Sequence, residues 1–331
     1  MPTFCRHNRL IQNCPICTRE QNVEMRPMVA PGGQTVRSSR GGGSRESAAR
    51  PSRPARPGQR AGAMTVRRLS RGTEDGYRSA LVPGLRSGAD AQRLADELAF
   101  AAARLVRLAA DPPGLYAEVA DPAGPIEERS WLAFMIAYLG PLDGEHPFSA
   151  VQQARTEWAS AQPPELDGVA LGPRSAHEPG AGPRTIDAYR AWAQRAGSQS
   201  AAYTGEPGWT AERRFARAFE RLALPGMPRG ARFELLTTLG RLGVYELRAG
   251  ALMLGGNDSV TLAAKRILGI GDPLLLERRA AELADACGLP LEALDVGLFN
   301  WERGSRARLG MAPDDEPDAA VIAGVQSALG V

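Results

Sequence analysis

Four side chains near the start of the sequence are of the types that bind zinc: Cys5, His7, Cys14 and Cys17. Their spacing, C-x-H-x6-C-x2-C, supplies the four soft or borderline ligands that tetrahedral zinc takes. Two alternatives are a redox Cys-x-x-Cys pair and a chance cluster, but a redox pair needs neither the histidine nor a third cysteine. We therefore predict a structural Zn²⁺ site in residues 1–20, with the metal driving folding because so short a segment buries no core.

A second group of residues has the pattern of a phosphate-binding turn. The stretch LGIGD places Gly269, Ile270 and Gly271 between two expected helices. Two glycines around one apolar residue permit a turn too sharp for larger side chains. In a helix-hairpin-helix, backbone N–H groups of such a turn bind a nucleic-acid phosphate. An ordinary helical pair with a Gly-rich turn is the alternative. A similar turn at residues 224–228 has Pro228 in place of the second glycine, and so lacks that donor.

The hairpin and the sequence before it resemble a known group of enzymes. LGIGD is similar to the hairpin of the DNA glycosylase superfamily, and Asp295 falls about where that superfamily has its catalytic aspartate. The likeness extends upstream through TIDAYRAWAQRAGSQ, EPGWTAERRFARAFERLALPG and RFELLTTLGRLGVYEL. Together, residues 185–302 resemble the alpha-glutamyl/putrescinyl thymine pyrophosphorylases, a glycosylase-related family, and most of all their bacterial third clade. The resemblance implies an all-α, helix-hairpin-helix DNA glycosylase-like body that binds DNA.

The resemblance also implies a reaction. The family replaces pyrophosphate on a 5-hydroxymethyl pyrimidine in DNA with an amine donor. This needs an acid near the reacting methylene, for which Asp295 is the candidate, and basic residues near the pyrophosphate, for which Lys265 and Arg266 are candidates. The base must be flipped out of the duplex, and Trp301 can then stack on it. Structural alternatives are a cap or ion pair for Asp295, solvated helix positions for Lys265 and Arg266, and core packing for Trp301.

Other kinds of chemistry find less support in the sequence. No lysine follows Gly271 where a lyase-type glycosylase has its Schiff-base lysine, so strand cleavage through an imine is not expected. A P-loop, a dinucleotide fingerprint, a Gly-x-Ser-x-Gly elbow and a His-Glu-x-x-His motif are also missing. Three interpretations remain: a DNA-base-modifying transferase, a monofunctional glycosylase that excises a modified base, and a non-catalytic nucleic-acid-binding protein. The sequence names neither the substrate base nor the amine donor.

The elements that must position these residues are helices. Alternating β-branched runs are missing from the sequence, and the apolar spacing predicts an all-α body. Asp258 or Ser259 is expected to cap the first hairpin helix, and Asp272 the second, with Pro273 at its first position. The other expected helices cover residues 90–110, 127–139, 148–159, 185–196, 210–222, 233–242, 245–254 and 319–329, with one more opening at residue 290.

The sequence divides into four parts by composition. We expect a zinc-binding segment, a disordered Arg/Gly/Pro-rich linker, a helical body and a tail with a short helix, at residues 1–20, 21–76, 77–310 and 311–331. Within the body, the Pro- and Gly-rich residues 161–183 predict a long loop, in which His177 is expected to face solvent.

Charge is distributed unevenly along the 331 residues, whose formal net charge is +3. From Arg26 to Arg71 there are 11 arginines and one acid, Glu46, a net +10 that leaves −7 for the remainder. This stretch is either a basic tether that favours nucleic acid or a spacer. The sequence has no apolar run as long as a membrane span, no apolar core of a secretory signal and no disulfide framework. A soluble cytoplasmic protein without a membrane partner is expected.

Overall fold

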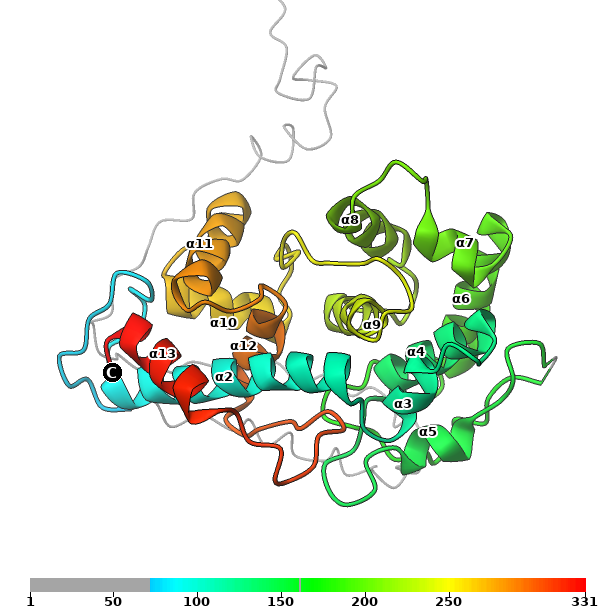
Figure 1. Ribbon diagram of the computed structural model, residues 1–331, viewed down its shortest axis with the longest axis horizontal. Helices are drawn as coiled ribbons and strands as arrows, with labels where there is room; N and C mark the ends of the chain where they lie inside the picture. Colours follow the sequence, from blue (N-terminus) through cyan, green and yellow to red (C-terminus); the bar gives the residue numbers. More distant parts are fainter. Residues whose placement is uncertain (1–71, 161) are drawn as a thin grey trace, which may run out of the picture. The chain divides into compact units, whose positions relative to one another are not determined.

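The computed structural model describes residues 72–160 and 162–331. Within these ranges the chain forms twelve α-helices and no β-strand, which confirms the all-α prediction (Figure 1). None of the described helices is long and apolar enough to span a membrane. The predicted zinc ligands Cys5, His7, Cys14 and Cys17 and the Arg-rich stretch up to residue 71 lie outside the described residues. The helices are α2 (Gly88–Ala110), α3 (Leu115–Ala120), α4 (Ile126–Leu139), α5 (Ser149–Ala154), α6 (Gly182–Ala196), α7 (Gln199–Thr204), α8 (Ala211–Arg221), α9 (Arg229–Arg241), α10 (Ser259–Leu268), α11 (Pro273–Ala286), α12 (Ala293–Arg303) and α13 (Ala319–Leu329).

Two groups of helices share the long helix α2 (Figure 1). In one group, α12 packs along α2 and α10, α10 meets α11, and α13 lies on α2. In the other, α4 contacts α3, α5, α7 and α9, and α8 lies between α7 and α9. Helix α2 also touches α9, so it contacts both groups.

Two local features explain how the helices pack. Residues 130–139 of α4, SWLAFMIAYL, are buried at every position, as expected for a helix that is apolar all round. Gly297 lies where α12 crosses α2, and a Cβ there would come within 2.7 Å of Leu98 Cδ2. The missing side chain therefore lets the two helices approach closely, and this contact holds the helix that carries Asp295.

One predicted helix is wrong. Residues 245–254 form an irregular segment, and Met253 in it has a φ of 59°. The backbone N–H groups of Leu252 and Leu254 donate to the Glu277 carboxylate of α11 instead of to helical carbonyls. A contact with a distant helix thus overrides the local apolar spacing. The structure also has two short helices, α3 and α7, that the sequence did not predict, and α5 ends five residues earlier than expected, at Ala154.

Candidate nucleic-acid interface and buried arginine centre

The hairpin between α10 and α11 has the predicted caps. The Asp258 side chain accepts the Thr261 N–H at the start of α10. Helix α10 ends at Leu268, and its C-cap Gly269 has a φ of 66°, in the left-handed region that glycine adopts without strain. Asp272 then accepts the N–H groups of Leu274 and Leu275, both at 3.0 Å, and Pro273 takes the first position of α11.

The turn itself exposes backbone donors. Among the described residues, no acceptor meets the backbone N–H groups of Gly269, Ile270 and Gly271. Gly269 and Gly271 are exposed and Ile270 is half-buried. A Cβ at Gly271 would meet no atom within 4 Å, so this side of the turn is open. Consecutive unpaired N–H groups of this kind are suited to an anionic oxygen group.

A segment before α2 lies against the turn, which the sequence did not predict. The Gly84 N–H donates to the Ile267 carbonyl at 2.9 Å, and a Cβ on Gly84 would lie 1.8 Å from the Arg266 carbonyl oxygen. Only a glycine allows this approach. The segment that contains Gly84 therefore packs directly against the end of α10, beside the hairpin turn.

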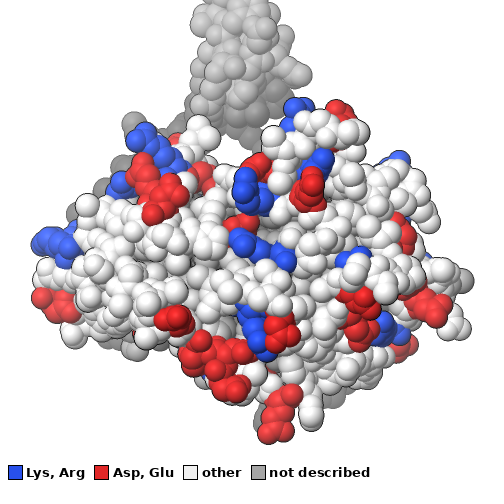
Figure 2. Space-filling model, in the orientation of Figure 1, with Lys and Arg blue, Asp and Glu red and all other residues white. Residues whose placement is uncertain are grey.

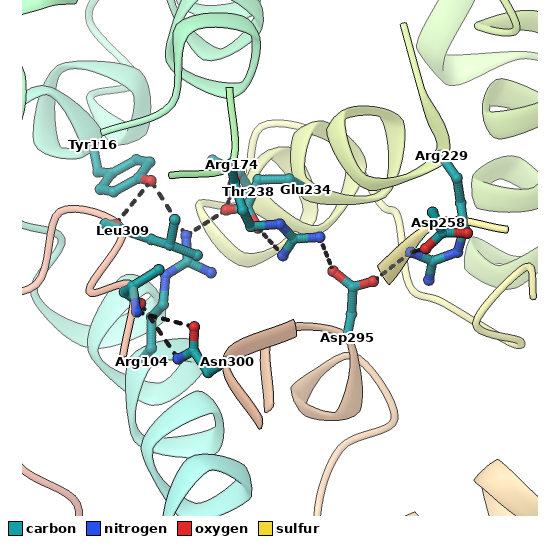
Figure 3. A network of polar contacts seen from close by, with 11 residues as sticks. Arg104, Tyr116, Arg174, Arg229, Glu234, Thr238, Asp258, Asp295, Asn300 and Leu309 are labelled. Carbon is teal, nitrogen blue, oxygen red and sulfur yellow. Dashed lines mark hydrogen bonds and ion pairs between the residues drawn. The ribbon is translucent and has the colours of Figure 1, made fainter. Parts of the chain in front are cut away.

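Asp295 lies in the first turn of α12, and only 1 % of it is exposed. Its Oδ1 accepts from Arg229 Nη1 at 2.7 Å, and its Oδ2 accepts from Arg174 Nη2 at 2.5 Å. Figure 3 shows the two guanidinium groups approaching the carboxylate from opposite sides. Arg229 begins α9, and Arg174 comes from the loop between α5 and α6. Three distant parts of the chain thus meet at one carboxylate.

The network continues on the far side of Arg174. Glu234 of α9 accepts from Arg174 at 3.4 Å and from Arg104 of α2 at 2.5 Å. Tyr116 accepts a further bond from Arg104, at 3.2 Å, and donates its hydroxyl to the Leu309 carbonyl at 3.2 Å (Figure 3). The side chains of three arginines and two carboxylates are buried here, and the half-buried Asp258 lies 3.6 Å from Arg229. The Nε and Nη1 of Arg104 have no partner in the described part of the chain.

The charge state of Asp295 limits what it can do. Burial alone raises the pKa of this carboxyl, but the positive charges of Arg174 and Arg229 outweigh burial and lower the pKa below its ordinary value. Asp295 is therefore ionised at neutral pH, and both of its oxygens are occupied. It cannot supply a proton as a general acid, but it can hold two guanidinium groups in place or stabilise positive charge.

We call the network of Arg104, Arg174, Arg229, Glu234 and Asp295 the arginine centre. The other predicted site residues do not belong to it. Lys265 Nζ donates to the Gly256 carbonyl at 3.3 Å, and Arg266 forms an ion pair with Glu302 at 2.5 Å. Trp301 is 3 % exposed, and its Nε1 donates to the Asp90 carbonyl at 3.0 Å. The Trp301 ring thus packs in the core, and a flipped base could stack on it only if the ring were uncovered.

The sequence predicts that His177 faces solvent, but in the structure this residue is buried. It is 9 % exposed, its Nδ1 lies 3.0 Å from the Tyr138 hydroxyl, and burial lowers its pKa. The reason is that the loop is tied to the end of α4, where the Gly172 N–H donates to Leu139 and the Ala176 N–H donates to Tyr138. The same attachment positions the arginine at residue 174.

The charge of the described region differs from that of the sequence before it. Residues 72–331 contain 26 Arg and Lys against 34 Asp and Glu, a formal net charge of −8. Figure 2 shows both signs interspersed on one face, with basic side chains near its middle, between α12 and α9. In the described ranges, no group of three His, Cys, Asp or Glu residues is placed to hold a metal ion. Affinity for a polyanion must therefore come from local groups of donors or from the basic stretch before residue 72.

Comparison with known proteins adds no relative: no protein-family model, curated protein or solved structure matches this chain.

Proposed function

We propose that this chain binds DNA through the turn at residues 269–271 and modifies a pyrimidine base at the arginine-flanked Asp295. The observation that carries this proposal is the turn with three N–H groups that meet no acceptor among the described residues. Helix α10, which leads into the turn, packs on α12, which carries Asp295. A phosphate-binding turn and a buried carboxylate would then belong to one helix-hairpin-helix unit of the DNA glycosylase type, and the resemblance to the thymine pyrophosphorylases supports the reaction.

The proposed reaction is a displacement at the 5-methylene carbon of the base. The amine nitrogen bonds to this carbon as the bond to the pyrophosphate oxygen breaks, and the amine proton passes to solvent or to the leaving pyrophosphate. Arg174 and Arg229 would stabilise the negative charge of the leaving group, a role that the sequence had suggested for Lys265 and Arg266. Asp295 would hold the two guanidinium groups.

Access to this centre requires a movement of the chain. Arg229 donates from Nε and Nη2 to the Leu252 carbonyl, at 3.1 and 2.6 Å. Leu252 belongs to the irregular segment that Glu277 holds against α11. Displacing this segment would free two Arg229 donors for a substrate phosphate, so in this proposal the segment opens when substrate binds.

A second candidate function is that of a non-catalytic DNA-binding protein. Both oxygens of Asp295 accept hydrogen bonds from arginines, and the residue is 1 % exposed. These properties are also those of an ion-pair network whose role is purely structural. In this alternative the arginine centre joins the two helix groups, and the hairpin alone carries the function.

The test uses duplex DNA with pyrophosphate on a 5-hydroxymethyl pyrimidine, incubated with the protein and either glutamate or putrescine. We expect pyrophosphate release and a base whose mass includes the amine, and the variant Arg174→Gln should lose most of this turnover. The matched control is Asp285→Asn, which changes an exposed residue of α11. Release of a free base instead would indicate a monofunctional glycosylase. DNA binding with no product from any such duplex would contradict the transferase and leave the non-catalytic alternative.

A further inference from the structure

A small cavity adjoins the hairpin turn. It has a volume of about 120 Å³, and three arginines line it, Arg86, Arg93 and Arg266, together with Gly84 and Trp301. Gly84 also borders the turn, because a Cβ built on Gly269 would lie 3.9 Å from the Gly84 Cα. A single glycine thus separates the cavity from the turn, whose N–H groups meet no acceptor among the described residues.

The arginines keep unused donors. Arg86 forms no ion pair with any described residue. Arg93 lies 3.6 Å from Asp90 and 5.4 Å over the Trp301 ring, and its Nε is buried without an acceptor in the described part of the chain. Arg266 is held by Glu302. Asp90 and Glu74 also line the cavity, and Glu302 neutralises Arg266, so Arg86 and Arg93 are the two arginines left to face these two carboxylates.

The chemistry of the cavity selects the ligand. On the same measure of volume one water molecule needs about 10–15 Å³, so 120 Å³ has room for a phosphate group. Guanidinium groups bind phosphate oxygens with paired, charge-assisted hydrogen bonds. The Gly84 N–H bond to Ile267 fixes the segment that carries Arg86 against the end of α10.

We infer that this cavity is a second phosphate site, which takes the phosphodiester next to the one bound by the turn. The inference rests on the proposed binding of DNA through residues 269–271. It assigns Arg86 and Arg93 as backbone-contacting residues that hold the strand in register, and it leaves base recognition to other groups.

The experiment measures duplex DNA affinity of the full chain across a range of salt concentrations. Arg86→Gln should weaken binding about tenfold, as expected for losing a charge-assisted bond, and Arg86→Lys should restore part of the loss. The double variant Arg86→Gln/Arg93→Gln should lower the salt slope by about 0.9, the value for one phosphate. Arg217→Gln, on α8 and 50 % exposed, is the matched control for a surface arginine.

The outcomes separate this inference from the proposed function. If Gly271→Val weakens binding but Arg86→Gln has no more effect than Arg217→Gln, the cavity is not a phosphate site and DNA binding by the turn stands. If Gly271→Val also binds like the parent, both proposals are wrong. Melting temperatures of all variants show whether a loss of affinity comes from unfolding.

Discussion

The turn at residues 269–271 and the centre at Asp295 belong to neighbouring helices but have opposite properties. The turn is exposed, and its N–H groups meet no acceptor among the described residues. In the centre, Asp295 is 1 % exposed, and both of its carboxylate oxygens accept hydrogen bonds from arginines. In the proposed function the turn would bind phosphate without any rearrangement, whereas the centre would first have to be uncovered. Binding and reaction would therefore respond differently to mutation.

The largest effect should come from breaking the centre. Asp295→Ala leaves the buried Arg174 and Arg229 without their shared partner, which we expect to cost about 3–5 kcal/mol in the free energy of unfolding. Chemical denaturation measures this loss. Glu220→Ala removes one partner of an exposed ion pair on α8 and should cost at most about 1 kcal/mol. If the two variants lose equally little, Asp295 does not hold the fold together.

The free energy of unfolding should depend on pH through Asp295 in the same centre. Because the folded pKa of Asp295 is lowered, its stabilisation is fully present above the ordinary aspartate pKa of about 4. It is lost as the pH falls from there through the lowered pKa. The stability difference between the parent and Asp295→Asn should therefore be large at pH 7 and shrink below pH ~4.

The sequence predicts a region well when its contacts join residues that are close together in the chain. Asp272, Pro273 and Gly269 act within one turn of their own positions, and all three were predicted. Arg174 and Arg229 are 121 and 66 residues away from Asp295, so no spacing in the sequence links them.

Two further differences between the sequence-based predictions and the structure also come from contacts between residues that are far apart in the chain. Residues 245–254 have helical apolar spacing, but the Glu277 carboxylate binds two of their N–H groups from another helix. His177 lies in a Pro- and Gly-rich stretch, yet backbone bonds to the end of α4 bury it. Local patterns thus predicted the caps and the turn, while long-range hydrogen bonds determined the rest.

In the proposed DNA binding, both the turn and the Arg-rich stretch of residues 26–71 would contribute affinity. The described region has a net charge of −8, so replacing the 11 arginines between residues 26 and 71 by glutamine should weaken binding at low salt. The salt slope should fall by about 0.9 for each phosphate that these arginines neutralise. This change keeps the length of the chain, so an unchanged slope would show that the stretch is only a spacer.

The smallest effect on DNA binding should come from the predicted zinc site, which lies outside the described residues. Metal analysis of the purified protein should give about one zinc ion per chain. The double variant Cys14→Ser/Cys17→Ser should lose this zinc while the helical body unfolds as in the parent, because the predicted ligands are confined to residues 5–17. Stoichiometric zinc that persists in the double variant would contradict the assignment.

The most direct test of the account is the duplex DNA affinity of Gly271→Val. The position has open space for a side chain, and its φ is not in the left-handed region, so the fold should be unaffected. Gly208→Val is the matched control, since Gly208 is also exposed with no atom within 4 Å of a Cβ. We predict that Gly271→Val weakens binding about tenfold or more, because the valine keeps a phosphate away from the turn, and that Gly208→Val binds like the parent. Equal affinities for the two variants would show that the turn only joins two helices.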